Sequence, residues 1–185
     1  MMEIYHPRED SYLLEKYVKK HAKGICLDMG TGSGIQAKAA ASSKKVVKVF
    51  ALDINRQAVG HCREIRNKKI ICLKSDLFMV FRGNRDYRDL KFDTIIFNPP
   101  YLPEEKKDKD IALDGGEKGY ELIQKFLNQA KFYMKPRTII LLVFSSFTGR
   151  DKVNQYLLKK GFRFREMEKA HIFFEDIYCY KIMQK

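Results

Sequence analysis

The chain has 185 residues, of which 45% are hydrophobic and 12% are aromatic, and its formal net charge is +13. This length and composition are typical of one globular domain with a sizeable core, and they exclude a disordered chain. No apolar run approaches the roughly 20 residues that a membrane-spanning helix requires. The longest, 139–144, has the length of a strand. We therefore expect a single domain over residues 1–185 and no contact with a membrane.

In chain order, the hydrophobic patterns alternate between strand-like and helix-like segments, which predicts an α/β fold with a mainly parallel sheet. They predict a helix over 9–21, a strand over 24–29, a helix over 35–42, a strand over 46–54, a helix over 56–66, strands over 70–74 and 92–97, a helix over 120–133, a strand over 138–145, a helix over 151–160, and strands over 162–168 and 172–182. Polar loops are expected at 82–91 and 102–117. The result is a Rossmann-like, seven-stranded, mostly parallel sheet with helices on both faces and a C-terminal antiparallel strand pair. Residues 1–23 form a helical segment that packs on this domain.

Charge and cysteine content limit the partners and the cellular compartment that we expect for this chain. A basic chain favours acidic partners such as RNA, but the lysines are spread over the sequence and no aromatic-rich RNA-binding strand is present, so a nucleic acid is not the favoured partner. The charged first ten residues do not resemble a signal peptide, so we expect a cytoplasmic protein. The four cysteines form no C-x-x-C pair, so we expect reduced thiols and no metal site, with Cys26 and Cys72 as small buried side chains.

A glycine-rich turn separates the first predicted strand from the next helix. It reads Asp28-Met29-Gly30-Thr31-Gly32-Ser33-Gly34. Glycines let a backbone turn tightly and approach a ligand closely, and the helix that follows offers free N–H groups. By itself the turn could be a nucleotide site or only a tight connection. Its spacing is not that of a pyrophosphate-binding G-x-G-x-x-G, and it has no P-loop lysine.

Two aspartates follow the next two strands. Asp53 ends the second strand, where a carboxylate can accept hydrogen bonds from both hydroxyls of a ribose. Asp76 follows the third strand and could accept from the exocyclic amine of an adenine, beside the backbone N–H of Leu77. Each aspartate alone could be a helix cap. Because the carboxyl ends of parallel strands share one edge, the three features together predict a binding site for a nucleoside-containing cofactor, with Ile54 beside it.

The fourth strand ends in Asn98-Pro99-Pro100-Tyr101, which could simply terminate a strand. Its chemistry also suits methyl transfer to a planar nitrogen. The Asn98 side-chain oxygen and the Pro99 carbonyl can each accept one N–H, and so orient the nitrogen lone pair toward an incoming methyl group. Pro100 stiffens the turn and removes a competing N–H, and Tyr101 can stack on the flat substrate group.

These motifs together resemble the class I methyltransferases that use S-adenosylmethionine (AdoMet) and methylate nitrogen. The stretch Ala112-Leu113-Asp114-Gly115-Gly116-Glu117-Lys118-Gly119 is similar to the loop that follows N-P-P-Y in the HemK family, and Tyr5-His6-Pro7-Arg8-Glu9-Asp10-Ser11 resembles the start of its archaeal and eukaryotic branch. The resemblance spans essentially the whole chain. It implies methylation of the glutamine amide in the Gly-Gly-Gln motif of a translation release factor.

The resemblance also implies roles for particular residues. AdoMet would be held by Ser11, near its methionine end, and by Asp28, Gly30, Thr31, Gly32, Gly34, Asp53, Ile54, Asp76, Leu77 and Asn98. In this branch a small zinc-binding activator often adds a strand beside the third strand, here 70–73. The sequence departs from bacterial HemK, which has an additional N-terminal helical domain, and Tyr120 replaces a leucine.

Two alternatives stay open. An adenine N6-type or other exocyclic-amine methyltransferase acting on RNA or DNA shares the N-P-P-Y motif, although no target-recognition domain is visible. A lysine of another protein is a further conceivable acceptor. Lys68-Lys69, next to the third strand, would equally protect a sheet edge against aggregation.

Overall fold

The computed structural model describes residues 4–100, 119–172 and 174–185. Its helices and strands follow one another as predicted, and their bounds in chain order are α1 (Glu9–His21), β1 (Gly24–Met29), α2 (Ile35–Ser42), β2 (Val46–Asp53), α3 (Arg56–Glu64), β3 (Ile70–Lys74), β4 (Phe92–Phe97), α4 (Glu121–Ala130), β5 (Met134–Ser145), α5 (Arg150–Lys159), β6 (Phe162–Ile172) and β7 (Glu175–Gln184). Short 3-10 turns lie between several of them.

The strands form one seven-stranded sheet in the order β3-β2-β1-β4-β5-β7-β6. Neighbouring strands from β3 to β5 are parallel, whereas β7 is antiparallel to both β5 and β6. The strand order reverses between β1 and β4, and in open α/β sheets a ligand binds at such a reversal, beyond the carboxyl ends of the strands. The predicted Rossmann-like sheet with its C-terminal antiparallel pair is confirmed.

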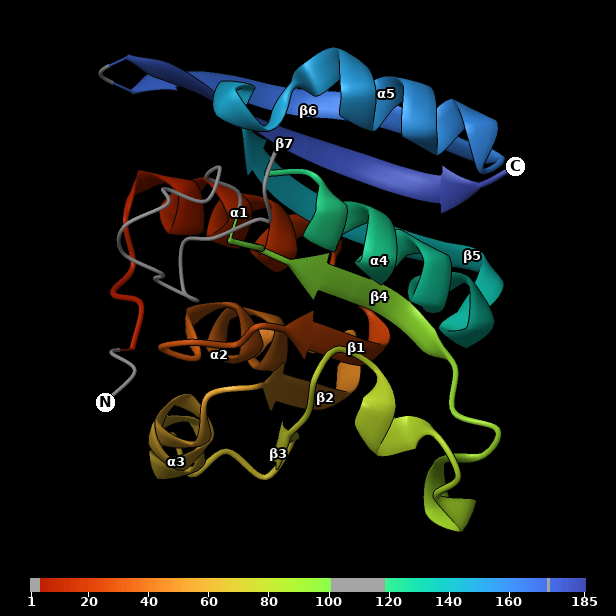
Figure 1. The fold of residues 1–185 in the computed structure, drawn as a ribbon. Helices are drawn as coiled ribbons and strands as arrows, with labels where there is room; N and C mark the ends of the chain where they lie inside the picture. Colours follow the sequence, from red (N-terminus) through yellow and green to blue (C-terminus); the bar gives the residue numbers. More distant parts are fainter. Residues whose placement is uncertain (1–3, 101–118, 173) are drawn as a thin grey trace.

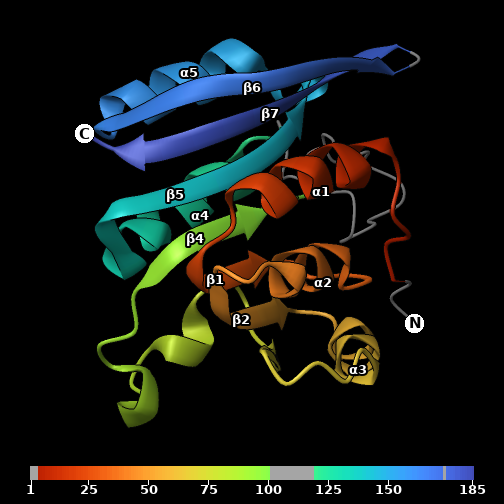
Figure 2. The ribbon, with the colours of Figure 1, turned by 180° about the vertical axis from the view of Figure 1, so that it is seen from behind.

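Helices cover both faces of the sheet. Helices α4 and α5 lie on the face turned toward the viewer in Figure 1, and α1, α2 and α3 lie on the opposite face, which Figure 2 shows from behind. The N-terminal helix α1 contacts α2 and also crosses to β5 and β7.

Two hydrophobic cores result from the alternation of side chains along the buried strands. In β5, Ile140, Leu142 and Phe144 join the core beneath α4 and α5, whereas Ile139 and Leu141 join the core beneath α1 and α2. This double burial explains why the predicted central strands read as continuous apolar runs.

Several element boundaries differ from the prediction. Strand β5 begins at Met134, four residues before the expected start, although Pro136 cannot donate a strand hydrogen bond. An irregular register where β4 pairs with β5, between Phe92 and Thr94, accommodates this proline, and Thr138 Oγ1 bonds the Phe92 carbonyl beside it. The expected helix over 120–133 ends at Ala130 and continues as a 3-10 turn, and the expected 82–91 loop contains another. Strand β6 extends four residues beyond its expected end, whereas β7 begins three residues later and ends two residues later than predicted.

The expectation of four reduced cysteines is wrong in this structure, because Cys62 of α3 and Cys72 of β3 form a disulfide. Their Cα atoms are 6.1 Å apart because α3 packs directly against β3, a geometry that a spacing of ten residues does not reveal. Cys72 is buried as predicted, as are the free thiols Cys26 and Cys179. Within the described ranges, no helix is both long and apolar enough to cross a membrane.

Candidate methyl-transfer site

The glycine-rich turn has the left-handed backbone that its sequence requires. Gly30, Gly32 and Gly34 have φ of 65°, 50° and 79°, a region that disfavours any side chain. A Cβ on Gly34 would approach Ile65 Cδ1 to 2.5 Å, so the end of that side chain would have to move. A Cβ on Gly30 would instead project to 4.0 Å from the Asn98 carbonyl oxygen, at the end of β4. The missing side chain of Gly30 therefore keeps the space between the turn and Asn98 open.

Asp28 stabilises this turn through hydrogen bonds from the residues that follow it. Its side chain is only 1% exposed, and its Oδ2 accepts hydrogen bonds from Thr31 Oγ1 at 2.7 Å and from the Ala37 backbone N–H at 3.0 Å. Burial raises the pKa of the Asp28 carboxyl to about 7. Asp28 and Thr31 are both buried, so their side chains stabilise the shape of the turn.

Asp53, at the carboxyl end of β2, links the turn to the second strand. Its Oδ2 accepts from the Gly32 N–H and its Oδ1 accepts from the Asn55 N–H, both at 2.8 Å. Burial raises the pKa of Asp53, and these backbone donors oppose the shift. The Ile54 N–H is a further backbone donor to this half-buried carboxylate, whose two oxygens together offer about four lone-pair sites. The next residue, Ile54, is 48% exposed and presents an apolar side chain beside it.

Asp76 lies two residues beyond the end of β3. Ser75 fixes the turn, because its Oγ donates to the Leu77 carbonyl and accepts from the Val80 N–H. Leu77 has a buried side chain and a left-handed backbone with φ of 46°. The Asp76 carboxylate is partly exposed and lies 3.4 Å from Lys125 Nζ. Sequence reasoning missed Ser75, since a single serine after a strand carries no specific signal.

The side-chain amide of Asn98 is fixed by the N-terminal segment. Its Nδ2 donates to Asp10 Oδ2 at 3.0 Å and approaches Ser11 Oγ at 3.5 Å. Asp10 is 3% exposed and also accepts from the Tyr5 hydroxyl and from the Ser11 N–H. A carboxylate only accepts hydrogen bonds, so the nitrogen of the Asn98 amide must face Asp10. The oxygen therefore points the other way.

That oxygen, Asn98 Oδ1, is buried and has no hydrogen-bond partner among the described residues. A buried acceptor without a partner costs free energy, of about 1–3 kcal/mol, and such groups cluster at functional sites. The sequence predicted the acceptor role of Asn98, but it assigned no role to Tyr5 or Asp10. Both residues belong to the opening motif, which was the available signal.

The predicted site residues from the described ranges lie at one edge of the sheet, toward which the arrowheads of β1, β2 and β4 point in Figure 1. Ser11 reaches this edge from α1, and Gln36 Nε2 holds its backbone carbonyl at 2.8 Å. Pro99 is buried and Pro100 is half-buried. Tyr101 and residues 112–118 of the double-glycine loop lie outside the described residues.

A nucleoside-containing cofactor fits these residues. The glycine turn leaves room beside Asn98, Asp53 offers a carboxylate to ribose hydroxyls, and Asn98 Oδ1 is a buried acceptor without a partner among the described residues. Among the residues that the structure describes, no cluster of histidine, cysteine or carboxylate side chains could hold a metal ion. The arrangement is suited to binding and orienting two substrates.

The sheet order, the glycine turn and the Asn-Pro-Pro edge define the Rossmann-like methyltransferase class. The chain belongs to the methyltransferase small domain family, whose model matches residues 9–174. A putative protein N5-glutamine methyltransferase of Methanocaldococcus jannaschii is 33% identical over 95% of this chain and 89% of its own length. A release factor glutamine methyltransferase of Buchnera aphidicola is 32% identical over 84% of this chain, which spans only 60% of that protein.

A solved structure has the same fold along its whole length. It is the E. cuniculi Mtq2-Trm112 complex, described as responsible for methylation of the eRF1 translation termination factor. The matched chain has a TM-score of 0.76 and 24% identity, with full coverage of both chains.

Proposed function

We propose that this chain is an AdoMet-dependent enzyme that methylates a glutamine side-chain amide, in the Gly-Gly-Gln motif of a translation release factor. The observation that carries the proposal is the buried, unpartnered Asn98 Oδ1 at the carboxyl edge of the sheet. The names of the M. jannaschii and B. aphidicola relatives support the glutamine substrate.

The proposed role of Asn98 follows from the chemistry of the acceptor. An amide nitrogen is a poor nucleophile because its lone pair is delocalised into the carbonyl group. Asn98 Oδ1 would accept one N–H of the substrate amide and the Pro99 carbonyl the other, which favours a pyramidal nitrogen. This is stabilisation of the transition state by preorganised acceptors. No general base is required, because the nitrogen becomes strongly acidic once it is methylated.

The cofactor would supply an electrophilic methyl group at the edge of β1, β2 and β4. Asp53 would accept from the ribose hydroxyls and Asp76 from the adenine amine, with the Leu77 N–H beside the ring and Ile54 covering it. Ser11 would hold the methionine end. Gly30, Gly32 and Gly34 would let the backbone approach the cofactor, and Asp28 and Thr31 would keep the turn in place.

A mass-spectrometric assay tests the proposal. Purified enzyme, AdoMet and a release factor are incubated, and the Gly-Gly-Gln peptide is examined for one added methyl group on glutamine. The Asn98→Ala variant tests the role of this side chain, and we expect a large loss of turnover and a small loss of AdoMet affinity. A glutamine that stays unmethylated, with and without a candidate activator, would refute the substrate. Label transferred to bulk RNA instead would favour the exocyclic-amine alternative.

The small zinc-binding activator would dock on β3, the edge strand of the sheet. Lys69 does not guard this edge, because its Nζ donates to the carbonyls of Ala41 and Ser43 at the end of α2. The carbonyl of Cys72 accepts a long 3.4 Å hydrogen bond from Arg63, which an added strand could replace. Co-purification and a rise in turnover with the activator are expected. We also propose that the enzyme is cytoplasmic.

A further inference from the structure

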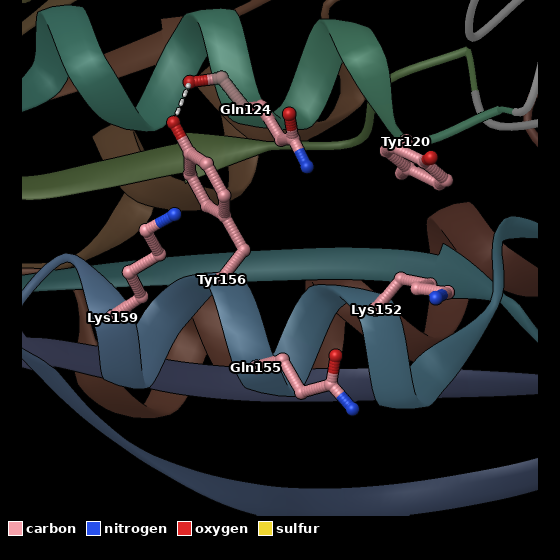
Figure 3. Close-up of a pocket in the computed structure, with 6 residues that line it drawn as sticks. All are labelled: Tyr120, Gln124, Lys152, Gln155, Tyr156 and Lys159. Carbon is pink, nitrogen blue, oxygen red and sulfur yellow. Dashed lines mark hydrogen bonds between the residues drawn. The ribbon is translucent and has the colours of Figure 1, made fainter.

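A groove between α4 and α5 is not part of the methyl-transfer site. Figure 3 shows it, and its lining residues are Tyr120, Gln124, Lys152, Gln155, Tyr156 and Lys159. None of them is acidic and none is aliphatic. All are partly or fully exposed, so none serves the hydrophobic core alone.

One tyrosine of the groove, Tyr156, is held in a fixed position. The Tyr156 hydroxyl donates to the Gln124 carbonyl at 3.3 Å, which ties α5 to α4 (Figure 3). Lys160 Nζ lies 5.5 Å from the centroid of the same ring and adds positive charge beside the groove. The ring is therefore oriented before any ligand arrives, so little side-chain entropy is lost when a flat group stacks on it.

The lysines stand at the two ends of the groove. Lys152 and Lys159 are seven residues apart on α5, about 10 Å along the helix axis. Figure 3 shows Lys152 near Tyr120 at one end of the groove and Lys159 near Tyr156 at the other end. Two cations that flank aromatic rings match a ligand in which negative charge and flat rings alternate.

We propose that this groove binds a short single-stranded nucleic acid, with phosphates on Lys152 and Lys159 and a base stacked on Tyr156. Such alternation of basic and aromatic side chains is how proteins bind single strands without reading their sequence. A duplex would hide the faces of its bases, so a single strand fits the tyrosine rings better. The net charge of +13 complements the phosphates. This bound strand is a partner and not the methyl acceptor.

Fluorescence anisotropy with labelled RNA and DNA oligonucleotides of about 12 nucleotides tests the proposal, since single-strand sites span roughly 4–16 nucleotides. We expect both single strands to bind more tightly than a duplex of the same sequence, and the RNA and DNA arms identify the preferred sugar. The double variant Lys152→Gln/Lys159→Gln should bind roughly tenfold more weakly at 0.1 M salt, and its salt slope should fall by about 1.4. The variant Lys20→Gln/Lys38→Gln, on the opposite helix layer, is the matched control and should bind within about twofold of the parent chain.

Two tyrosine variants separate stacking from charge. Tyr156→Leu should weaken binding by roughly fivefold or more, whereas Tyr156→Phe, which keeps the ring, should retain most of it. Equal losses in the groove and control lysine variants would show diffuse charge attraction and overturn the proposal. Displacement of the oligonucleotide by polyglutamate with the same dependence on the variants would also overturn it, in favour of an acidic polypeptide.

Discussion

Replacing Asp10 with asparagine is the sharpest test of how the site is built. The substitution keeps the shape of the side chain and changes one acceptor oxygen into a donor. In the native chain, Asp10 Oδ1 accepts from the Ser11 N–H at 2.6 Å, and Oδ2 accepts from Asn98 Nδ2 at 3.0 Å. The variant cannot satisfy both donors while Asn98 keeps its orientation.

Two arrangements remain for the Asp10→Asn variant. If the new oxygen faces Asn98, the new amide nitrogen opposes the buried Ser11 N–H, which costs about 1–3 kcal/mol. If the new nitrogen faces Asn98, the Asn98 amide rotates and presents its nitrogen to the substrate. The second arrangement pairs the Ser11 N–H with the new oxygen and the Asn98 oxygen with the new nitrogen, and it places Asn98 Nδ2 where Oδ1 lies in the native chain. Restoring the reactive orientation then costs about 2 kcal/mol, which corresponds to a roughly 30-fold lower rate.

A single-turnover measurement checks this expectation. The rate of methyl transfer to a release factor is followed at saturating AdoMet, with AdoMet affinity from calorimetry and a thermal melt to confirm folding. Tyr5→Phe is the control, because it removes one donor to Asp10 and leaves the contacts of Asp10 with Ser11 and Asn98 intact. Its rate should fall much less. An Asp10→Asn enzyme with the native rate would refute the view that Asp10 orients Asn98.

Three further predictions concern the cofactor edge and the core. Asp53→Ala should raise the dissociation constant of AdoMet by about 10- to 100-fold and alter saturated turnover far less, because hydrogen bonds from ribose to a carboxylate are lost; calorimetry and steady-state kinetics measure the two effects. Burial raises the pKa of Asp28 to about 7, so the unfolded chain releases this proton near pH 4 while the folded chain retains it, and stability should fall as pH rises from about 4 to 7. Asp28→Asn should abolish this loss, which amounts to about 4 kcal/mol at most. Denaturant melts of the parent chain at pH 4 and 8 measure the free energy of unfolding, and equal values at the two pH values would show that Asp28 stays ionised. Reduction of the Cys62–Cys72 disulfide should lower the free energy of unfolding by about 2–3 kcal/mol, as measured in melts with and without reductant, and a Cys62→Ser variant that reductant destabilises equally would contradict this.

The fold was predictable because its central strands are buried on both faces. Residues 139–144 are apolar without interruption, and both cores of the structure use them. Element ends were less predictable where one residue opposes the pattern. Pro136 masked the start of β5, since a proline inside a strand is accommodated only by an irregular register that depends on the neighbouring strand.

The parts of the site that lie within a single sequence motif were predictable. The glycine turn, Asp53 and Asn98 each end a strand, and the sheet brings strand ends together. The contacts of Asp10 with Asn98 and of Gln36 with Ser11 depend on how α1 packs against the sheet and α2. The Cys62–Cys72 disulfide likewise depends on the packing of α3 on β3. No local pattern in the sequence encodes these distances.

The bond between Asp10 and Asn98 joins residues that are 88 positions apart. The helix that supplies Asp10 is attached mainly by side chains, including the hydrogen bond from the Tyr17 hydroxyl to Glu168 at 2.7 Å. Partial opening of a protein releases such peripheral helices before the central sheet. Heating should therefore inactivate the enzyme below its melting temperature, when α1 undocks and the Asn98 amide loses its orientation while the sheet is still intact. Loss of activity on heating would then report the undocking of α1 before the rest of the protein unfolds.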